Sequence, residues 1–72
     1  MSAEKKTITL LGKSYTVRCP VGKEDELNLT VQRLSKLLEE TQSRSGLSAR
    51  EDIIMMTALN LCHQQLHNDD KD

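Results

Sequence analysis

The ten residues IIMMTALNLC, at positions 53–62, are apolar at every position except Thr57 and Asn60. At helical spacing these side chains cover most of the circumference of a helix. A helix that is apolar nearly all round must be buried nearly all round. A chain of 72 residues can form only a few other elements to cover it. The stretch therefore predicts a helix whose burial is completed by a second copy of the chain.

The composition strengthens this prediction. The chain has no Trp and no Phe, and Tyr15 is its one aromatic residue. Small folds that lack large aromatic side chains compensate with disulfides, metal ions or oligomerisation. Cys19 and Cys62 do not form a Cys-x-x-Cys motif, and both occupy apolar positions, so we interpret them as buried reduced thiols. One bridge between them stays possible in principle, but oligomerisation is the favoured remedy.

Two alternating segments flank Gly12-Lys13 and predict an antiparallel hairpin over residues 7–19. A two-residue loop that opens with Gly favours a type II′ turn, in which Leu11 pairs with Ser14. Residues that oppose each other share a face of a hairpin. The apolar face is then expected to carry Ile8, Leu10, Tyr15 and Val17, and the polar face Thr7, Thr9, Thr16 and Arg18.

Two helices are predicted after Pro20, which ends the second strand. The first runs from about 23 to 42, with an apolar stripe of Leu27, Val31, Leu34 and Leu38. A polar break at 43–46 follows, and a capping box from Ser48 to Glu51 starts the second helix, at about 48–67. The fold class is thus α+β, with a single head domain over 1–68 and a polar tail at 69–72. The second helix is long and is expected to form a two-fold dimer interface through Ile54, Met55, Ala58, Leu59, Leu61, Cys62 and Leu66.

The chain carries no pattern typical of an enzyme. His63 and His67 stand four residues apart, a spacing that can hold a metal ion, but two ligands do not complete a site. We interpret them as polar-face histidines. The glycines do not form a phosphate loop, and no carboxylate pair lies in an apolar frame. We therefore expect no catalytic residue, no cofactor and no metal.

Charge indicates which partners to expect. The 10 basic and 11 acidic residues give a net charge of −1, without the basic excess of a nucleic-acid binder. No apolar run reaches membrane length, so we expect a cytoplasmic protein with no membrane partner. The basic residues Lys13, Arg44 and Arg50 fall at or beside predicted loops, where binding residues concentrate. Together with Glu51 they form a candidate protein-binding surface.

The stretch from Ile8 to Pro20 resembles the opening of the ZapA family of bacterial cell-division proteins. The resemblance covers about residues 5–66, continues through Leu34 and Leu38, and is most specific at Ala-Leu-Asn-Leu, 58–61. It implies a protein that binds FtsZ filaments at the mid-cell division site and promotes or stabilises their bundling. It also implies a globular head that dimerises and a helical extension whose coiled coil joins two dimers into a tetramer.

The resemblance implies that basic residues in the hairpin turn and around the interhelix loop contact FtsZ. Lys13 and Arg44 fall on such positions, and Arg50 lies nearby. Gln42 and Gly46 depart from the family pattern, since other members often carry basic side chains there. The chain also ends at Asp72, where members normally continue with a coiled coil, so we expect a homodimer and no stable tetramer.

Two other functions are compatible with a small dimer of this kind. A ribbon–helix–helix DNA-binding protein is the alternative from another class, although the near-neutral charge and the threonine-rich polar face of the hairpin count against it. An antitoxin or adaptor of unknown target could use the same dimer as a scaffold. The sequence features alone do not separate an adaptor from a filament-binding protein.

Overall fold

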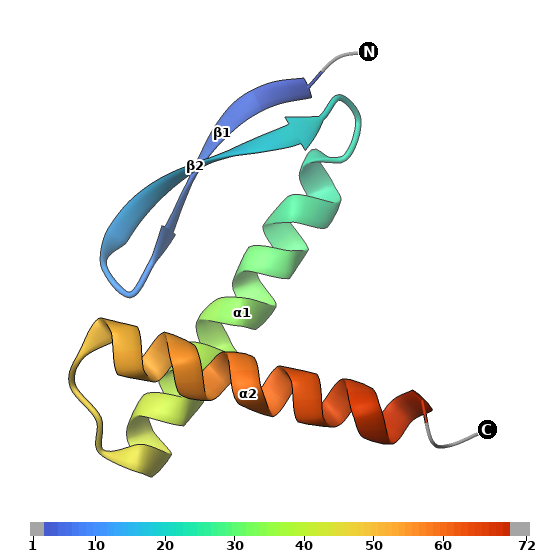
Figure 1. Cartoon of the computed structure of the whole chain (residues 1–72). Coiled ribbons are helices and arrows are strands. Elements are labelled where there is room, and N and C mark those ends of the chain that lie inside the picture. The colour runs from blue at the N-terminus through green and yellow to red at the C-terminus, as the bar shows by residue number, and fades with distance from the viewer. Residues whose placement is uncertain (1–2, 70–72) are drawn as a thin grey trace. The chain divides into compact units, whose positions relative to one another are not determined.

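A computed structural model describes residues 3–69 (Figure 1). The elements follow in the order β1 (Ala3–Leu10), β2 (Lys13–Pro20), α1 (Glu24–Ser45) and α2 (Arg50–Asp69). This order confirms the predicted α+β class, a hairpin followed by two helices. The chain divides into two compact units whose boundary lies within α1, between Lys36 and Leu37. The single head domain over 1–68 stays a prediction.

The hairpin forms, but its predicted register is wrong. Strands β1 and β2 pair from Ala3↔Pro20 to Leu10↔Lys13, so Leu11 and Gly12 are the two loop residues. Both have positive φ, 51° and 76°, which is the signature of a type I′ turn. The twist of this turn matches that of the strands. That match outweighs the left-handed conformation of Leu11, which costs roughly 1–2 kcal/mol.

The predicted faces of the hairpin are confirmed, because a register change of two residues leaves every side chain on its original face. On the apolar face, Ile8, Leu10, Tyr15 and Val17 are half-buried and Cys19 is buried, whereas the threonines of the other face are exposed. Both strands of the pair belong to one chain. A ribbon–helix–helix protein instead contributes one strand per chain to an intermolecular pair.

A tight turn joins the hairpin to α1. The Lys23 amide donates to the Pro20 carbonyl over 3.0 Å, and Gly22 takes a φ of 90°, which a type II turn requires at that position. Helix α1 then begins at Glu24, one residue later than predicted, with three acidic residues in its first turn. These carboxylates stabilise the positive end of the helix dipole. The less exposed face of α1 carries the predicted stripe of Leu27, Val31, Leu34 and Leu38, together with Leu37.

Helix α1 extends three residues beyond its predicted end at Gln42. It ends at Ser45, and the Gly46 amide donates to the Gln42 carbonyl over 3.0 Å. Gly46 has a φ of 73°, so it closes the helix as a left-handed C-terminal residue. The polar residues from 43 to 45 are compatible with a final helical turn, and the helix stops only where glycine permits the reversal. Arg44 therefore lies in α1 and not in a loop.

Helix α2 begins at Arg50, two residues later than predicted. The Ala49 carbonyl accepts the first helical hydrogen bond, from the Ile53 amide at 3.1 Å, so Ala49 occupies the N-cap position predicted for Ser48. The helix ends at Asp69. Of the predicted tail at 69–72, the first residue is thus helical, and residues 70–72 lie outside the described residues.

Few apolar side chains are fully buried. Among residues 3–69 these are Cys19, Leu38 and Ile53. Such a small core agrees with the aromatic-poor composition. Within the same residues, neither helix is long and apolar enough to span a bilayer.

Candidate interaction surface

Helix α2 has one covered face and one open face. Ile53 and Thr57, one turn apart, are 1% and 3% exposed. Met55, Leu59 and Leu66 are 59%, 56% and 62% exposed. At about 100° per residue, these three lie on the side of the helix away from Ile53 and Thr57. One copy of the chain therefore covers only a narrow part of this apolar helix.

The open face forms a continuous stripe. It consists of Met55, Leu59, Cys62 and Leu66, all exposed, and we refer to these four residues as the α2 stripe. Their spacing of four, three and four residues is that of a coiled-coil seam. Exposed apolar residues in such a contiguous arrangement are typical of protein–protein contact sites. The α2 stripe is thus a candidate self-association surface.

The other predicted interface residues lie beside this stripe. Ile54 and Ala58 are exposed on one flank of it, and Leu61 lies farther round towards the covered face. Leu61 is 38% exposed and lines a pocket between α1 and α2. The buried thiol predicted for Cys62 is wrong for the single chain, because Cys62 is exposed, whereas Cys19 is buried as predicted.

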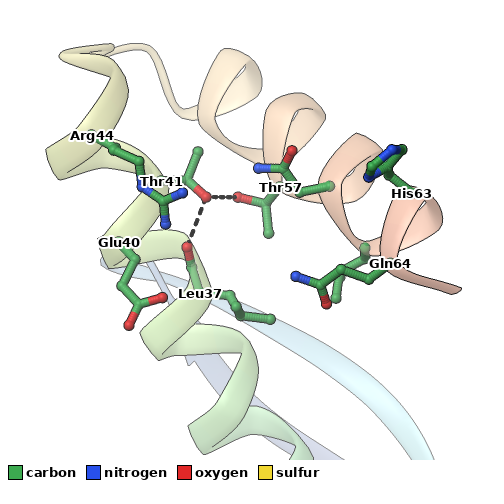
Figure 2. Close-up of a pocket in the computed structure, with 9 residues that line it drawn as sticks. Leu37, Glu40, Thr41, Arg44, Thr57, His63 and Gln64 are labelled. Atoms are coloured by element: carbon green, nitrogen blue, oxygen red, sulfur yellow. Dashed lines mark hydrogen bonds between the residues drawn. The ribbon is translucent and has the colours of Figure 1, made fainter. Parts of the chain in front are cut away.

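Two threonines connect the covered face of α2 to the last turns of α1 (Figure 2). The Thr57 hydroxyl donates to Thr41 Oγ1 over 2.9 Å, and Thr41 in turn donates to the Leu37 carbonyl over 2.8 Å. The Ile53 carbonyl lies 2.8 Å from Thr57 Oγ1 and is a second acceptor for the same proton. Both threonines are buried, so the pair satisfies polar groups that would otherwise be costly to bury.

A pocket of about 200 Å³ opens beside the threonine pair. In Figure 2, Glu40 and Arg44 come from α1, and His63 and Gln64 from α2. Most of its lining is polar, which suits a partner side chain or water better than an apolar ligand. The lining residues are Leu37, Glu40, Thr41, Arg44, Thr57, Asn60, Leu61, His63 and Gln64.

The predicted partner-binding residues fall in both units. Arg44 lies in the last turn of α1, where its charge is favourable for the helix dipole, and it lines the pocket. Arg50 and Glu51 are exposed in the first turn of α2 and are not among the pocket residues. Lys13 belongs to the other unit. The structure thus assigns Arg44, Arg50 and Glu51 to one unit, without joining them into one site.

Lys13 is the first residue of β2 and directly follows the turn, in which it was predicted to lie. Its Nζ atom lies 5.5 Å from the centroid of the Tyr15 ring. This is a cation–π distance, so the ring restricts where the ammonium group points. The contact gives Lys13 a preferred position on an otherwise exposed hairpin end.

The threonine pair and the pocket were not predicted from the sequence. The signal for Thr57 was present, because it is one of two polar residues in the stretch 53–62. Its partner Thr41 could not be found in the same way. Thr41 lies sixteen residues earlier, in a helix segment with many polar neighbours.

Comparison with known proteins gives one consistent family. The model of the family described as "Cell division protein ZapA" matches residues 7–72. The chain is similar to cell division protein ZapA of Yersinia pseudotuberculosis serotype O:1b (strain IP 31758) and of Yersinia pestis bv. Antiqua (strain Angola). Each is 34% identical over 64 residues, which are 89% of this chain and 59% of the relative.

The chain therefore spans 59% of the length of these curated relatives. No solved structure matches it significantly. The family match nevertheless extends over the hairpin from Thr7 and over both helices. This protein belongs to the ZapA family of cell division proteins.

Proposed function

We propose that this protein is an accessory of the bacterial division ring that binds FtsZ filaments as a homodimer and promotes or stabilises their bundling at mid-cell. Family membership supports the role in cell division. The observation that carries the mechanism is the α2 stripe, which gives the chain an apolar surface for a second copy. The chain needs no catalytic group for this function.

Self-association follows from the cost of leaving the stripe in water. Burial of apolar surface stabilises by roughly 25 cal/mol per Å². A two-fold axis through this helix would pair Met55, Leu59, Cys62 and Leu66 with the same residues of the second copy. Ile54 and Ala58 would extend the contact on one flank. Leu61 would contribute at its edge, beside the pocket.

The filament contact is assigned to Lys13, Arg44, Arg50 and Glu51. The position of Arg50 supports this assignment, because a cation in the first turn of a helix opposes the helix dipole and costs about 0.3–1 kcal/mol. Because Arg50 destabilises the helix at this position, it is a better candidate for binding than for folding. Lys13, positioned over Tyr15, presents a second cation from the hairpin.

Bundling requires that one assembly hold two filaments. A homodimer carries two copies of each contact, so the second binding event is intramolecular and avidity exceeds the single affinity. Dimers could join into a tetramer only through a longer C-terminal helix than the 20 residues of α2. We therefore expect a dimer to bind filaments and to cross-link them more weakly than a tetramer would.

Co-sedimentation with FtsZ polymerised by GTP tests the proposal directly. The chain is expected in the pellet at micromolar concentration, together with an increase in light scattering. Lys13→Ala, Arg44→Ala and Arg50→Ala should each reduce the pelleted fraction without changing the dimer. Lys36→Ala, which removes an exposed cation from the middle of α1, is the matched control and should bind like the unmodified chain.

The absence of co-sedimentation with filaments would contradict the proposed function. Equal binding by the three variants and the Lys36→Ala control would contradict the assigned residues but not the function. A salt-dependent gel shift with duplex DNA would instead favour a nucleic-acid-binding role.

A further inference from the structure

The C-terminal turns of α2 carry a pair of side chains that filament binding does not use. His63 and His67 are the only histidines of the chain, and both are exposed. Their Nε2 atoms lie 3.2 Å apart. The ring centroids are 4.4 Å apart and the ring planes meet at 75°. The two rings therefore lie with their Nε2 atoms within hydrogen-bonding distance of each other.

This separation suits two ligands of one metal ion. Imidazole nitrogens bind Zn²⁺ at about 2.0–2.1 Å, and two such bonds at a tetrahedral angle place the nitrogens about 3.3 Å apart. We propose that His63 and His67 form a two-residue binding site for a divalent transition-metal ion such as Zn²⁺. The ion accepts the lone pair of each Nε2, so in the bound form each neutral ring carries its proton on Nδ1, and the hydrogen bond between the two Nε2 atoms is replaced.

The position on the helix favours a cation. His67 lies in the last turn of α2, where the free carbonyl groups form the negative end of the helix dipole. Among residues 3–69 no group of three or more His, Cys, Asp and Glu residues could hold a metal ion. The two rings supply two ligands, and water would complete the coordination, as it does at sites with open positions.

The ligand type determines which ions bind. Imidazole suits Zn²⁺, Cu²⁺ and Ni²⁺, whereas Mg²⁺ and Ca²⁺ prefer oxygen ligands. The site is thus expected to bind Cu²⁺ more tightly than Ni²⁺ and not to respond to Mg²⁺. An ion bound by two residues four positions apart also cross-links one turn of the helix. Since it binds the folded helix, it should raise the melting temperature as its concentration rises.

Two histidines make the test simple, because each ring gives a separate set of imidazole ¹⁵N signals. The full chain is titrated with ZnCl₂, and the ring nitrogens are followed by NMR while the melting temperature is followed by circular dichroism. We expect both Nε2 signals to shift together and to saturate at one ion per chain. MgCl₂ at the same concentrations should leave both signals unchanged.

Matched variants separate chelation from binding to single side chains. His67→Gln should abolish the response of His63 over the same concentrations. The double variant His67→Gln/Asn68→His keeps two imidazoles but places them five residues apart, on different sides of the helix, and should also lose binding. Cys62→Ser removes the adjacent thiol and should bind ZnCl₂ like the unmodified chain.

The site would be overturned by a shift of only one ring, by unchanged binding of the double variant, or by loss of binding in Cys62→Ser. An Nε2 pair that stays joined by an N–H···N hydrogen bond in the presence of ZnCl₂ gives no shift and equally contradicts the proposal. The test does not use FtsZ, so its result is independent of the proposed filament contact.

Discussion

The hairpin and helix α2 differ in how their apolar residues are distributed over their faces. In the hairpin, Ile8, Leu10, Tyr15, Val17 and Cys19 share the less exposed face, and the threonines lie on the other face. In α2 the apolar residues surround the helix, and only Ile53 is fully buried. A strand that alternates needs one covered face, whereas a helix that is apolar all round needs cover on every side.

This difference shows that the uncovered apolar surface lies on α2 and not on the hairpin. The hairpin has the polarity expected of a surface element in a finished fold. Helix α2 has the polarity of a core element, but one chain covers only the side of α2 that faces α1. The difference predicts that substitutions on the open side of α2 affect association, whereas substitutions on its covered side and in the hairpin affect the fold of the single chain.

The largest effect is expected at the centre of the α2 stripe. Leu59→Glu should weaken dimerisation by about 4 kcal/mol, roughly a thousand-fold in dissociation constant, because each copy would bury an unpaired charge. Sedimentation equilibrium measures this change. Leu59→Met keeps the apolar surface and Asn68→Glu adds the same charge away from the stripe, so both controls should remain dimeric. A dimeric Leu59→Glu variant would show that the stripe is not the interface.

The covered side of α2 gives the second largest effect. Ile53→Ala should lower the free energy of unfolding by about 3 kcal/mol, since it leaves a cavity at a side chain that is 1% exposed. Met56→Ala removes an apolar side chain that is 40% exposed and lies outside the predicted interface, so it should cost about 1 kcal/mol or less. Urea denaturation followed by circular dichroism measures both. Equal losses would mean that the two sides of α2 do not differ as described.

The hairpin turn allows a substitution that should stabilise the chain. Leu11→Asn should raise the free energy of unfolding by about 1 kcal/mol, because asparagine adopts the left-handed conformation more readily than leucine and Asn-Gly is a preferred type I′ pair. Gly12→Ala should lower it by about the same amount. In the register first predicted, Leu11 would be a paired strand residue and its replacement would destabilise. The sign of the change therefore distinguishes the two registers.

The smallest effect is expected at the threonine pair. Thr57→Val removes the hydrogen bond to Thr41 and should lower the free energy of unfolding by about 0.5–1 kcal/mol. The double variant Thr41→Val/Thr57→Val should be less destabilised than the sum of the single variants, because each single variant already removes the same hydrogen bond between the two hydroxyls. A double-mutant cycle from thermal or urea unfolding measures the coupling. Strict additivity would show that the pair contributes nothing as a pair.

Much of the fold could be predicted from local patterns. The period of two in the hairpin and the period of 3.6 in α1 depend only on which residues are apolar, so the elements and their faces were predicted correctly. The boundaries were less accurate. Helix α1 continues through residues 43–45 of the predicted polar break and ends at Ser45, because polar residues permit a helical turn and only the left-handed Gly46 stops it.

The candidate site was predictable in part. The residues of the α2 stripe were named from their apolar character, and the structure shows them exposed on one chain. The partner-binding residues were named from charge and from the family resemblance. Their grouping was not predictable, because placing Arg44 in α1 beside the pocket depends on where that helix ends.

A hairpin followed by two helices could be predicted from the residues alone, together with a second helix more apolar than one short chain can bury, because hydrophobic periodicity and length are properties of the chain. The type I′ register, the Thr41–Thr57 contact and the open side of α2 became known only from the folded structure. These features depend on which residues come into contact in the folded unit, and the local sequence pattern does not specify those contacts.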